Sequence, residues 1–303
     1  MTKVAVVMRT YERPVLLARA LASVAGQSFT DYELVVVNNG GSPYGVDKVV
    51  GLSRVKNVRV LHLNERVGME AASNAALSTC TAEYFAIHDD DDAWLPDFLH
   101  ETVACLDAEP GAAAVVAGVT RVHETMRGDK VYPVREETMY LNNDRLTLEG
   151  MIGHNPFPPI AALFRFSLLD KVGMFDDSLP VLGDWEFNLR AVTCGRFVHL
   201  DRSLARYHTR TPDSDVAMGN SITVGVDLHR TVKKQLQQRW LAEPAVNGIN
   251  KGELALREEA RLEAENARRE AEAAAARSVT RRLVRAVTNP AHGVRAVRRR
   301  LGW

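Results

Sequence analysis

Four consecutive aspartates, Asp89 to Asp92, directly follow Glu83–His88, a largely apolar segment with the composition of a buried strand. Carboxylates this close raise the cost of ionising one another, so a chain keeps them most easily where a cation neutralises them. Hard divalent ions prefer carboxylate oxygens and substrate phosphates. The run therefore predicts a Mg²⁺ or Mn²⁺ site. The structural alternative is a solvated acidic turn that caps the helix beginning near Pro96.

The segments that must position this cluster alternate between strand-like and helix-like character. Lys3–Met8 is a short β-branched run typical of a buried strand, and further strands are predicted at Leu34–Val37, Val58–Leu63, Glu83–His88 and Ala113–Val122. Helices are predicted between them at Pro14–Ala25, Met69–Ser78 and Pro96–Ala108. This order predicts an α/β fold with an open, mostly parallel, Rossmann-like sheet and helices on both faces. Ligands of such sheets bind at the carboxyl ends of the strands, where the aspartates lie.

The chain is less regular from about residue 125 to 159. His154–Pro159 contains three prolines and is predicted to be a loop. The remaining predicted elements are strands at Ile160–Phe164, Phe197–Leu200 and Leu204–Tyr207 and a helix at Asp184–Cys194.

The composition changes after about Trp240. Glu253–Glu272 is rich in Ala, Glu and Arg and predicts a helix with too few Leu or Ile for a coiled-coil seam. The tail from Arg277 to Trp303 carries arginines, apolar residues and no acids, so it could lie on an anionic lipid surface or be a solvated basic tail. These features predict a first domain at residues 1–240 and a helical extension at 241–303. The extension could also mediate self-association into a homo-oligomer.

The bulk composition excludes several classes of protein. The 303 residues have a formal net charge of zero, which argues against a nucleic-acid binder. Three cysteines without a CxxC pair fit neither a disulfide framework nor a zinc finger. No stretch approaches the length of a membrane span, and the N-terminus lacks a signal-peptide pattern. A cytoplasmic protein, at most associated with a membrane surface, is expected.

Four stretches carry a family resemblance that covers about residues 1–210. They are Val4–Pro14, Tyr32–Ser42, Tyr84–Pro96 and Val172–Arg190. In this order and spacing they resemble the inverting family 2 glycosyltransferases of the GT-A fold. The resemblance implies metal-dependent transfer of a sugar from a nucleotide-diphosphate donor, most simply a UDP-sugar, to a hydroxyl group. The implied acceptor is a glycan or a lipid-linked molecule, as in the synthesis of bacterial surface polysaccharides.

The resemblance also implies roles for the acidic residues. Asp89-Asp90-Asp91 matches the D-x-D motif of the family. Asp91 would bind the Mg²⁺ or Mn²⁺ ion that bridges the donor diphosphate, and Asp89 would hold the ribose or the same ion, with Asp90 between them at the donor. Asp184 matches the last carboxylate of the family's E-D-W element and would be the general base.

The remaining implied contacts surround the donor. Tyr11 matches the aromatic residue that stacks on the nucleotide base, and Thr10 and Arg13 belong to the same loop. Arg66 lies near the family's base or phosphate contacts. The structural alternatives are a Tyr11 packed on the sheet edge and an exposed Arg66.

The sequence departs from the family pattern at several positions. Asn38 and Asn39 stand where the family has Asp; an amide can still pair with a pyrimidine, but the choice of nucleotide becomes open. Gly183 replaces the Glu before the base, and Ser73 replaces an Arg. The late His of the family is shifted to His208, which is either a metal or phosphate ligand or a structural residue.

Two further residues are candidates for sugar contacts. Trp185, beside the predicted base, could stack on an acceptor sugar or could be a core residue at the helix start. His154, in the proline-rich loop, could contact donor or acceptor hydroxyls.

Two other functions compete with sugar transfer. A sugar nucleotidyltransferase would carry a glycine-rich loop after the first strand, and Arg9–Arg13 contains no glycine. A non-catalytic binding or partner subunit of similar fold is favoured by the departures at Gly183, Asn38 and Asn39.

Overall fold

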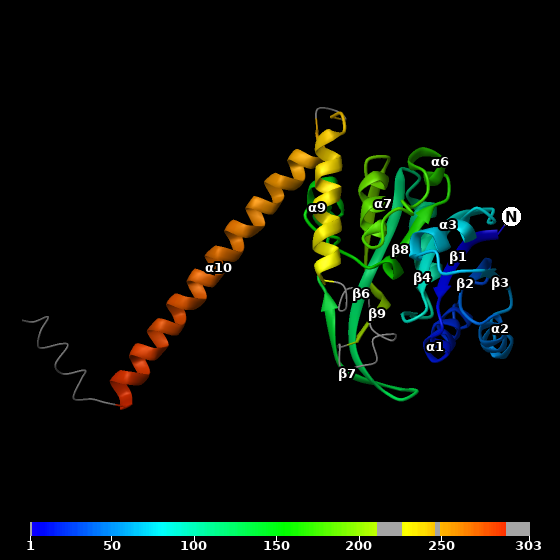
Figure 1. Ribbon diagram of the computed structural model, residues 1–303, viewed down its shortest axis with the longest axis horizontal. Coiled ribbons are helices and arrows are strands. Elements are labelled where there is room, and N and C mark those ends of the chain that lie inside the picture. Colours follow the sequence, from blue (N-terminus) through cyan, green and yellow to red (C-terminus); the bar gives the residue numbers. More distant parts are fainter. Residues whose placement is uncertain (1, 211–225, 246–248, 289–303) are drawn as a thin grey trace, which may run out of the picture.

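A computed structural model describes residues 2–210, 226–245 and 249–288, without the side chains of residue 226 and residues 275–288. A nine-stranded sheet in the order β3-β2-β1-β4-β8-β6-β9-β5, with β7 joined to β6, forms its centre (Figure 1). The strands are β1 (Thr2–Thr10), β2 (Tyr32–Asn39), β3 (Val58–Leu63), β4 (Ala82–Asp89), β5 (Ala93–Trp94), β6 (Ala112–Arg127), β7 (Lys130–Met139), β8 (Ala162–Arg165) and β9 (Arg196–Arg210).

The first half of the sheet is parallel and positions the site. β1 lies between β2 and β4, with Thr10 opposite Asn38 and Arg9 opposite Asp89. Val4–Met8 of β1 is completely buried, as expected for a strand covered on both faces. The carboxyl ends of β1, β2 and β4 therefore meet at one edge.

The second half of the sheet contains both strand directions. β8 is antiparallel to both β4 and β6, whereas the long strands β6 and β9 run parallel to each other. β7 is antiparallel to β6, with a bulge between His123 and Glu124. The predicted α/β fold with a mostly parallel sheet and packed helices is thus confirmed.

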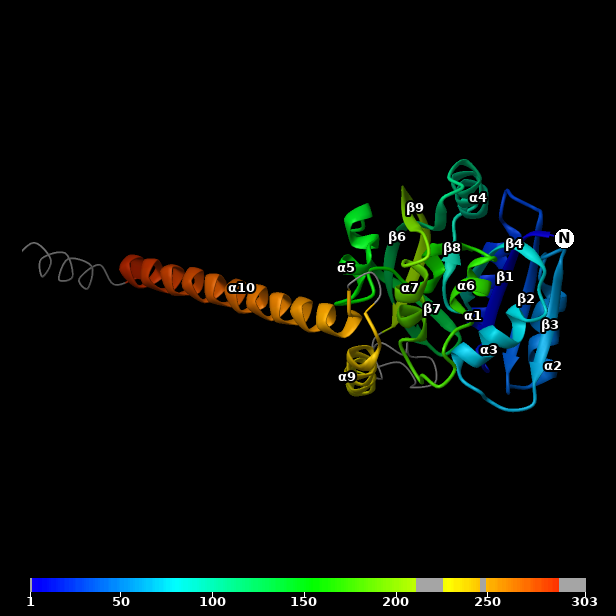
Figure 2. The ribbon, with the colours of Figure 1, turned by 90° about the horizontal axis from the view of Figure 1, so that it is seen from above.

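Helices connect the strands and cover the sheet (Figure 2). They are α1 (Pro14–Ala25), α2 (Pro43–Leu52), α3 (Met69–Leu77), α4 (Phe98–Ala108), η1 (Asn143–Leu146), α5 (Leu148–Met151), η2 (Pro159–Ala161), α6 (Leu168–Val172), α7 (Gly183–Ala191), α9 (Val226–Ala242) and α10 (Lys251–Thr288). α1 begins at Pro14, whose fixed φ suits the first helical turn, and buries Leu17, Leu21 and Val24.

Several predicted elements differ from the observed ones. The two short strands predicted at 197–200 and 204–207 are parts of the single strand β9, and the helix predicted at 184–194 begins at Gly183 and ends at Ala191. The region predicted to be irregular contains β7, a strand exposed along most of its length. Its exposure explains why it lacks the apolar alternation of a half-buried strand.

The last two described helices differ in how they are held. α9 packs on the domain through Val232, Leu236 and Trp240, and the Trp240 indole meets Trp185 edge to face at 5.4 Å between ring centroids. α10 buries Ala255 near its start and then projects away from the domain (Figure 1).

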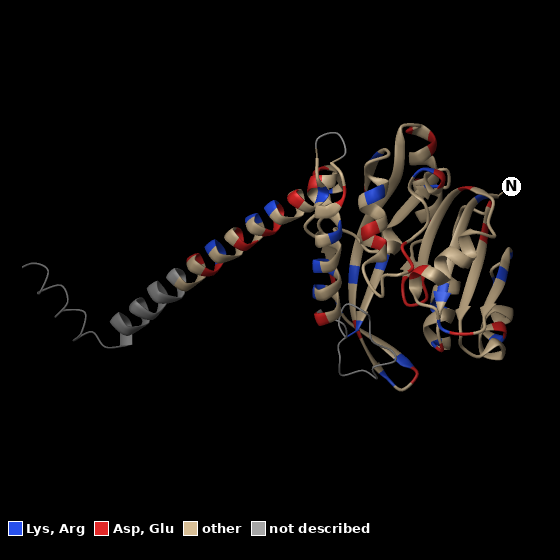
Figure 3. Ribbon diagram, turned by 45° about the horizontal axis from the view of Figure 1, so that its top comes forward, with Lys and Arg blue, Asp and Glu red and all other residues tan. Residues whose placement is uncertain are grey.

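Charges of both signs alternate along the described part of α10 (Figure 3). Arg261 lies 3.3 Å from Glu265, and Arg268 lies 2.9 Å from Glu272, so the helix pairs its own charges one turn apart. No described helix is long and apolar enough to cross a membrane. The division at residue 240 remains a prediction, and the basic tail assigned to membrane contact lies outside the residues whose side chains are described.

Candidate active site

The candidate site lies where the carboxyl ends of β1 and β4 meet the first turns of α3 and α7. β1 supplies Arg9, β4 ends at Asp89, α3 supplies Glu70 and α7 supplies Asp184. Arg9 is the cation that these three carboxylates share, because the charges of all three raise its pKa against the effect of burial.

Guanidinium groups of the chain itself neutralise the aspartate run. Arg9 donates from Nε to Asp89 Oδ1 at 3.0 Å, and Arg13 donates from Nε to Asp90 Oδ2 at 3.2 Å. Asp91 Oδ2 is bonded by Arg210 and lies 3.4 Å from Arg13 Nη1. The alternative of a solvated acidic turn is wrong, because Asp90 and Asp91 are only 0% and 6% exposed.

The aspartates differ in their affinity for protons. Burial raises the pKa of Asp90 to about 6 against the opposing charge of Arg13. Burial, together with the charges of Asp91 and Asp89, raises the pKa of Asp92 well above its ordinary value. Burial acts on Asp91 in the same direction, but Arg13 and Arg210 outweigh it and lower its pKa. Asp91 is therefore the buried carboxylate of the run that is held ionised.

A divalent ion fits this loop only with ligands from a substrate. Among the described residues, no group of three or more His, Cys, Asp and Glu side chains is arranged to hold a metal ion. His208, a predicted metal ligand, approaches the loop through its backbone N–H, which donates to Asp92 Oδ1 at 2.8 Å. Mg²⁺ and Mn²⁺ accept phosphate oxygens readily, so Asp91 with a diphosphate forms a chemically reasonable ligand set.

A buried network lies behind Asp91. Glu124 of β6, which is 2% exposed, accepts from Arg19 Nη1 at 2.8 Å, from Arg210 Nη1 at 2.6 Å, and lies 2.8 Å from His208 Nδ1. These partners outweigh burial and lower the Glu124 pKa to about 2. Glu124 thus holds Arg210, the guanidinium that bonds Asp91.

His88, one residue before the aspartates, is neutral in the fold. It is fully buried, lies 2.8 Å from the Asp89 carbonyl oxygen through Nδ1, and meets Trp94 edge to face. Burial lowers its pKa to about 4. A histidine whose folded pKa lies below its unfolded value of about 6.5 contributes stability above that value and loses it as the pH falls.

This shift predicts a pH-dependent stability that a single substitution removes. Between pH 7.5 and 5, the unfolding free energy of wild type should fall by about 2 kcal/mol relative to that of His88→Gln. The reason is that His88 becomes protonated in the unfolded state but stays neutral in the folded state. Urea unfolding of both proteins at the two pH values measures the difference. The exposed His100→Gln is the control, and a gap between wild type and His88→Gln that stays constant with pH would contradict the assignment.

The loop after β1 forms one wall of the predicted nucleotide site. The Arg66 guanidinium lies 4.5 Å from the centre of the Tyr11 ring, so these two predicted donor contacts stack on each other. Beside them is a cavity of about 240 Å³. It is lined by Thr10, Glu12, Arg13, Pro14, Leu17, Ser42, Gly45 and Val46.

Asn38 and Asn39 hold loops rather than face this cavity. Asn38 accepts from the Gly41 N–H at 3.0 Å and donates to the Gly41 carbonyl at 2.7 Å. Asn39 accepts from Val67 N–H at 2.9 Å and donates to the Gly68 carbonyl at 3.1 Å. Both amides therefore hold the loops that follow β2 and β3, and their contact with the nucleotide base remains a prediction.

Asp184 is presented at the start of α7. The residue before this helix, Leu182, has a φ of 67°, and Asn155 donates from Nδ2 to Asp184 Oδ2 at 2.7 Å. Burial raises the Asp184 pKa, while Arg9 opposes the shift. A carboxylate whose pKa moves toward neutrality is better suited to take a proton.

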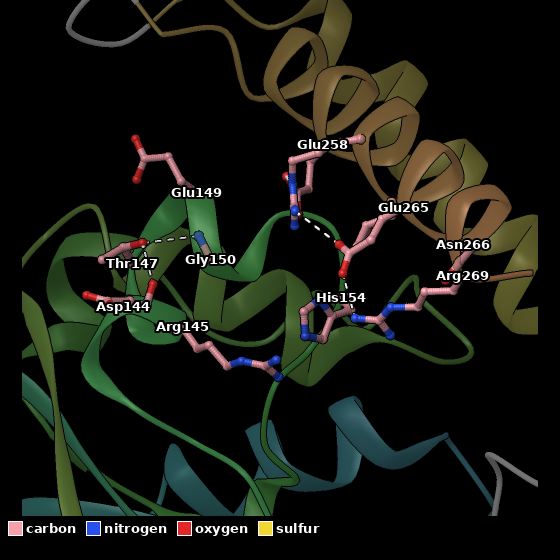
Figure 4. Close-up of a pocket in the computed structure, with 12 residues that line it drawn as sticks. Asp144, Arg145, Thr147, Glu149, Gly150, His154, Glu258, Glu265, Asn266 and Arg269 are labelled. Atoms are coloured by element: carbon pink, nitrogen blue, oxygen red, sulfur yellow. Dashed lines mark hydrogen bonds and ion pairs between the residues drawn. The ribbon is translucent and has the colours of Figure 1, made fainter. Parts of the chain in front are cut away.

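Two predicted sugar contacts lie elsewhere. Trp185 is 1% exposed and donates from Nε1 to the Met151 carbonyl at 2.7 Å, so it is a core residue and offers no face to a sugar. His154 is exposed and lines a cavity of about 440 Å³ between the domain and α10 (Figure 4). Figure 4 shows charged side chains around His154, among them Arg145 and Glu258.

The residues of the site that were not predicted include Arg9, Glu70, Glu124 and Arg210. Arg9 follows the apolar run Val4–Met8 near the end of β1, which is a sequence signal for a partner at the sheet edge. Glu70 shares a helix face with Ser73 and Leu77, both of which are buried, so its burial could have been anticipated. Glu124 and Arg210 lie far along the chain from the aspartates and carry no comparable signal.

Comparison with known proteins points to one family. The model of glycosyl transferase family 2 matches residues 5–173. Over 192 residues the chain is 28% identical to the uncharacterized glycosyltransferase YwdF of Bacillus subtilis, covering 62% of this chain and 68% of that one. Over 126 residues it is 32% identical to the succinoglycan biosynthesis protein ExoW of Rhizobium meliloti, covering 39% of each.

Solved structures share the fold at low sequence identity. Staphylococcus aureus TarS 1-349 in complex with UDP-GlcNAc has a TM-score of 0.63 and 19% identity, covering 84% of this chain and 70% of that one. The mannosyltransferase PcManGT of Pyrobaculum calidifontis, in complex with GDP-Man and Mn²⁺, has a TM-score of 0.61 and 20% identity, covering 99% and 80%.

Proposed function

This chain belongs to glycosyl transferase family 2, and we propose that it transfers a sugar from a nucleotide-diphosphate donor to a hydroxyl group of a glycan or lipid-linked acceptor. The observation that carries the proposal is that Asp184, whose pKa is raised, shares Arg9 with Asp89, the first residue of the run in which Asp91 is held ionised. Transfer creates negative charge on the leaving diphosphate and a proton to remove from the acceptor. The two carboxylates suit these two demands.

Asp184 is the proposed general base of a single, inverting displacement. It would take the acceptor proton while Asn155 holds its Oδ2. A divalent ion bound at Asp91 would supply Lewis-acid stabilisation of the leaving diphosphate. The Arg13 guanidinium lies beside Asp90 and Asp91. It could bind the donor phosphates instead by a change of its side-chain conformation alone.

The donor is proposed to be a UDP-sugar. TarS binds UDP-GlcNAc and PcManGT binds GDP-Man with Mn²⁺, which supports a nucleotide-sugar donor and a divalent ion without deciding the base. ExoW, a succinoglycan biosynthesis protein, supports a role in polysaccharide synthesis. The expected cytoplasmic location is part of this proposal.

Calorimetric titration with UDP, GDP and dTDP, with and without Mn²⁺, tests the proposal. We expect one nucleotide, UDP, to bind at least about 10-fold more tightly with Mn²⁺, since an ion held by Asp91 would neutralise charge on the diphosphate. Asp91→Ala should remove this gain, whereas Asp129→Ala, an exposed carboxylate in the β6–β7 turn, should keep it.

The other outcomes separate the competing functions. Equal affinity with and without Mn²⁺ would contradict the metal role and assign diphosphate neutralisation to the arginines. Binding of none of the three nucleotides would favour a non-catalytic subunit. A parallel titration with UTP tests the nucleotidyltransferase, which would be favoured if UTP bound more tightly than UDP.

A further inference from the structure

Position 183 requires a glycine because of a neighbouring side chain and not because of its own backbone conformation. It begins α7 and has no positive φ, so its conformation is open to residues with a side chain. A Cβ built on it would lie 2.6 Å from Glu70 Cδ and nearer still to Cγ and Oε1. The space where a side chain at position 183 would begin is therefore filled by the Glu70 carboxyl group.

Glu70 reaches this place from a different element. It lies in the first turn of α3 and is 4% exposed. A charged side chain is rarely so buried without a partner. Arg9 provides the opposite charge. The neighbouring carboxylates of Asp184 and Asp89 interact electrostatically with Glu70 and raise its pKa. Burial, the largest effect, raises its pKa to about 7.

The sequence beside Asp184 shows which side chain Glu70 replaces. Gly183 directly precedes Asp184, at the position where the family resemblance implies a glutamate. In this chain the carboxylate at that place belongs to Glu70 of α3, which lies 113 residues before Gly183 (183 − 70). Gly183 and Glu70 are thus complementary, because the absent side chain at 183 leaves the space that the Glu70 carboxyl group fills.

We propose that Glu70 is a positioning residue of the transfer site, which takes the place of a side chain at position 183 and, by sharing Arg9, fixes Asp184 and Asp89 relative to each other. This inference rests on the proposed transfer function. Without Glu70, Arg9 would be drawn wholly to the two aspartates, and the first turn of α7 would lose the group packed against it. Misplacement of a base by about 1 Å can cost on the order of 10²-fold in rate.

A thermal double-mutant cycle tests the exchange of space without any substrate. Gly183→Ala should lower the melting temperature by roughly 3–10 °C, because its methyl group overlaps Glu70. In the Glu70→Ala background the same substitution should cost nothing. An equal loss in both backgrounds would overturn the exchange of space.

Donor turnover tests the positioning role. UDP, GDP or dTDP release would be measured with a panel of their sugars and Mn²⁺. Glu70→Ala should lower kcat by about 10- to 100-fold with the donor KM within about threefold, and Glu70→Gln, which keeps the volume, should lower kcat by about 10-fold while melting like wild type. Glu70→Ala/Gly183→Glu should regain most of kcat, and the matched Glu70→Ala/Gly183→Ala should not.

The outcomes distinguish this inference from the function on which it rests. A Glu70→Gln variant with full kcat, or a Glu70→Ala/Gly183→Glu variant without recovery, would overturn the positioning role while transfer itself stands. No turnover by wild type with any donor would overturn the proposed function and with it the role of Glu70 in transfer. The thermal cycle would still decide the exchange of space.

Discussion

Asp184→Asn should lower sugar transfer by about 10²–10⁴-fold while the affinity for the nucleotide changes by less than about threefold. The amide has the size of the carboxylate and can still meet Asn155, but it cannot accept a proton from the acceptor hydroxyl. The proposed contacts to the donor diphosphate come from the ends of β1 and β4 and not from α7, so they should persist. Rates measured with donor in excess, combined with calorimetry of UDP binding, separate the two effects.

The neighbouring acidic loop supplies a control for this experiment. Asp177 is exposed in the segment that leads to α7, and Asp177→Asn should transfer at the wild-type rate. Full turnover by Asp184→Asn would show that another group takes the proton. Loss of nucleotide affinity along with the rate would instead indicate that Asp184 organises the donor side.

Glu124→Gln should lower the free energy of unfolding by about 3–5 kcal/mol. Glu124 is the buried carboxylate shared by Arg19, Arg210 and His208, and its removal leaves those buried groups without the charge that offsets their desolvation. Urea denaturation at pH 7.5 measures the loss. The same substitution should also loosen Arg210 from Asp91, so nucleotide binding measured below the unfolding midpoint should weaken.

Glu137→Gln provides the matched comparison. Glu137 also pairs with Arg121, Arg135 and His123, but its side chain is 37% exposed, and pairs in water contribute little. We expect the urea midpoint of this control to stay close to that of wild type. If both variants lost a similar amount of unfolding free energy, burial would not be the reason why the Glu124 network stabilises the protein.

The elements around the site could be predicted because their signals are local. Pro14 and Gly26 bound α1, and the apolar run before Asp89 gives β4 within one residue at each end. Parallel strands that end together bring Arg9, Asn38 and Asp89 to one edge, so the position of the site follows from the order of the elements.

The parts that could not be predicted depend on partners distant in the chain. β7 includes Pro133 and is mostly exposed; it forms because the long strand β6 offers it an edge, where proline is tolerated. Arg210 meets Asp91 across 119 residues, and no local pattern in the sequence announces that pair. Trp185 was ambiguous for the same reason, since its burial depends on Trp240 of α9.

The arginines around the aspartate run alter how cation binding should be understood. Asp91 already has guanidinium partners, so an ion that arrives alone must compete with Arg13 and Arg210. A diphosphate removes that conflict, because it offers those arginines new anionic partners as the ion takes the carboxylate. Ion and nucleotide should therefore each strengthen the binding of the other.

The 38 residues of α10 set a fixed reach. At 1.5 Å per residue the helix is about 57 Å long, whereas a flexible chain of the same length would have a root-mean-square span of about 34 Å. Arg–Glu pairs one turn apart support the helix without a neighbouring surface. The helix thus separates its own two ends by a set distance, so α10 acts as a rigid spacer rather than as a flexible tether.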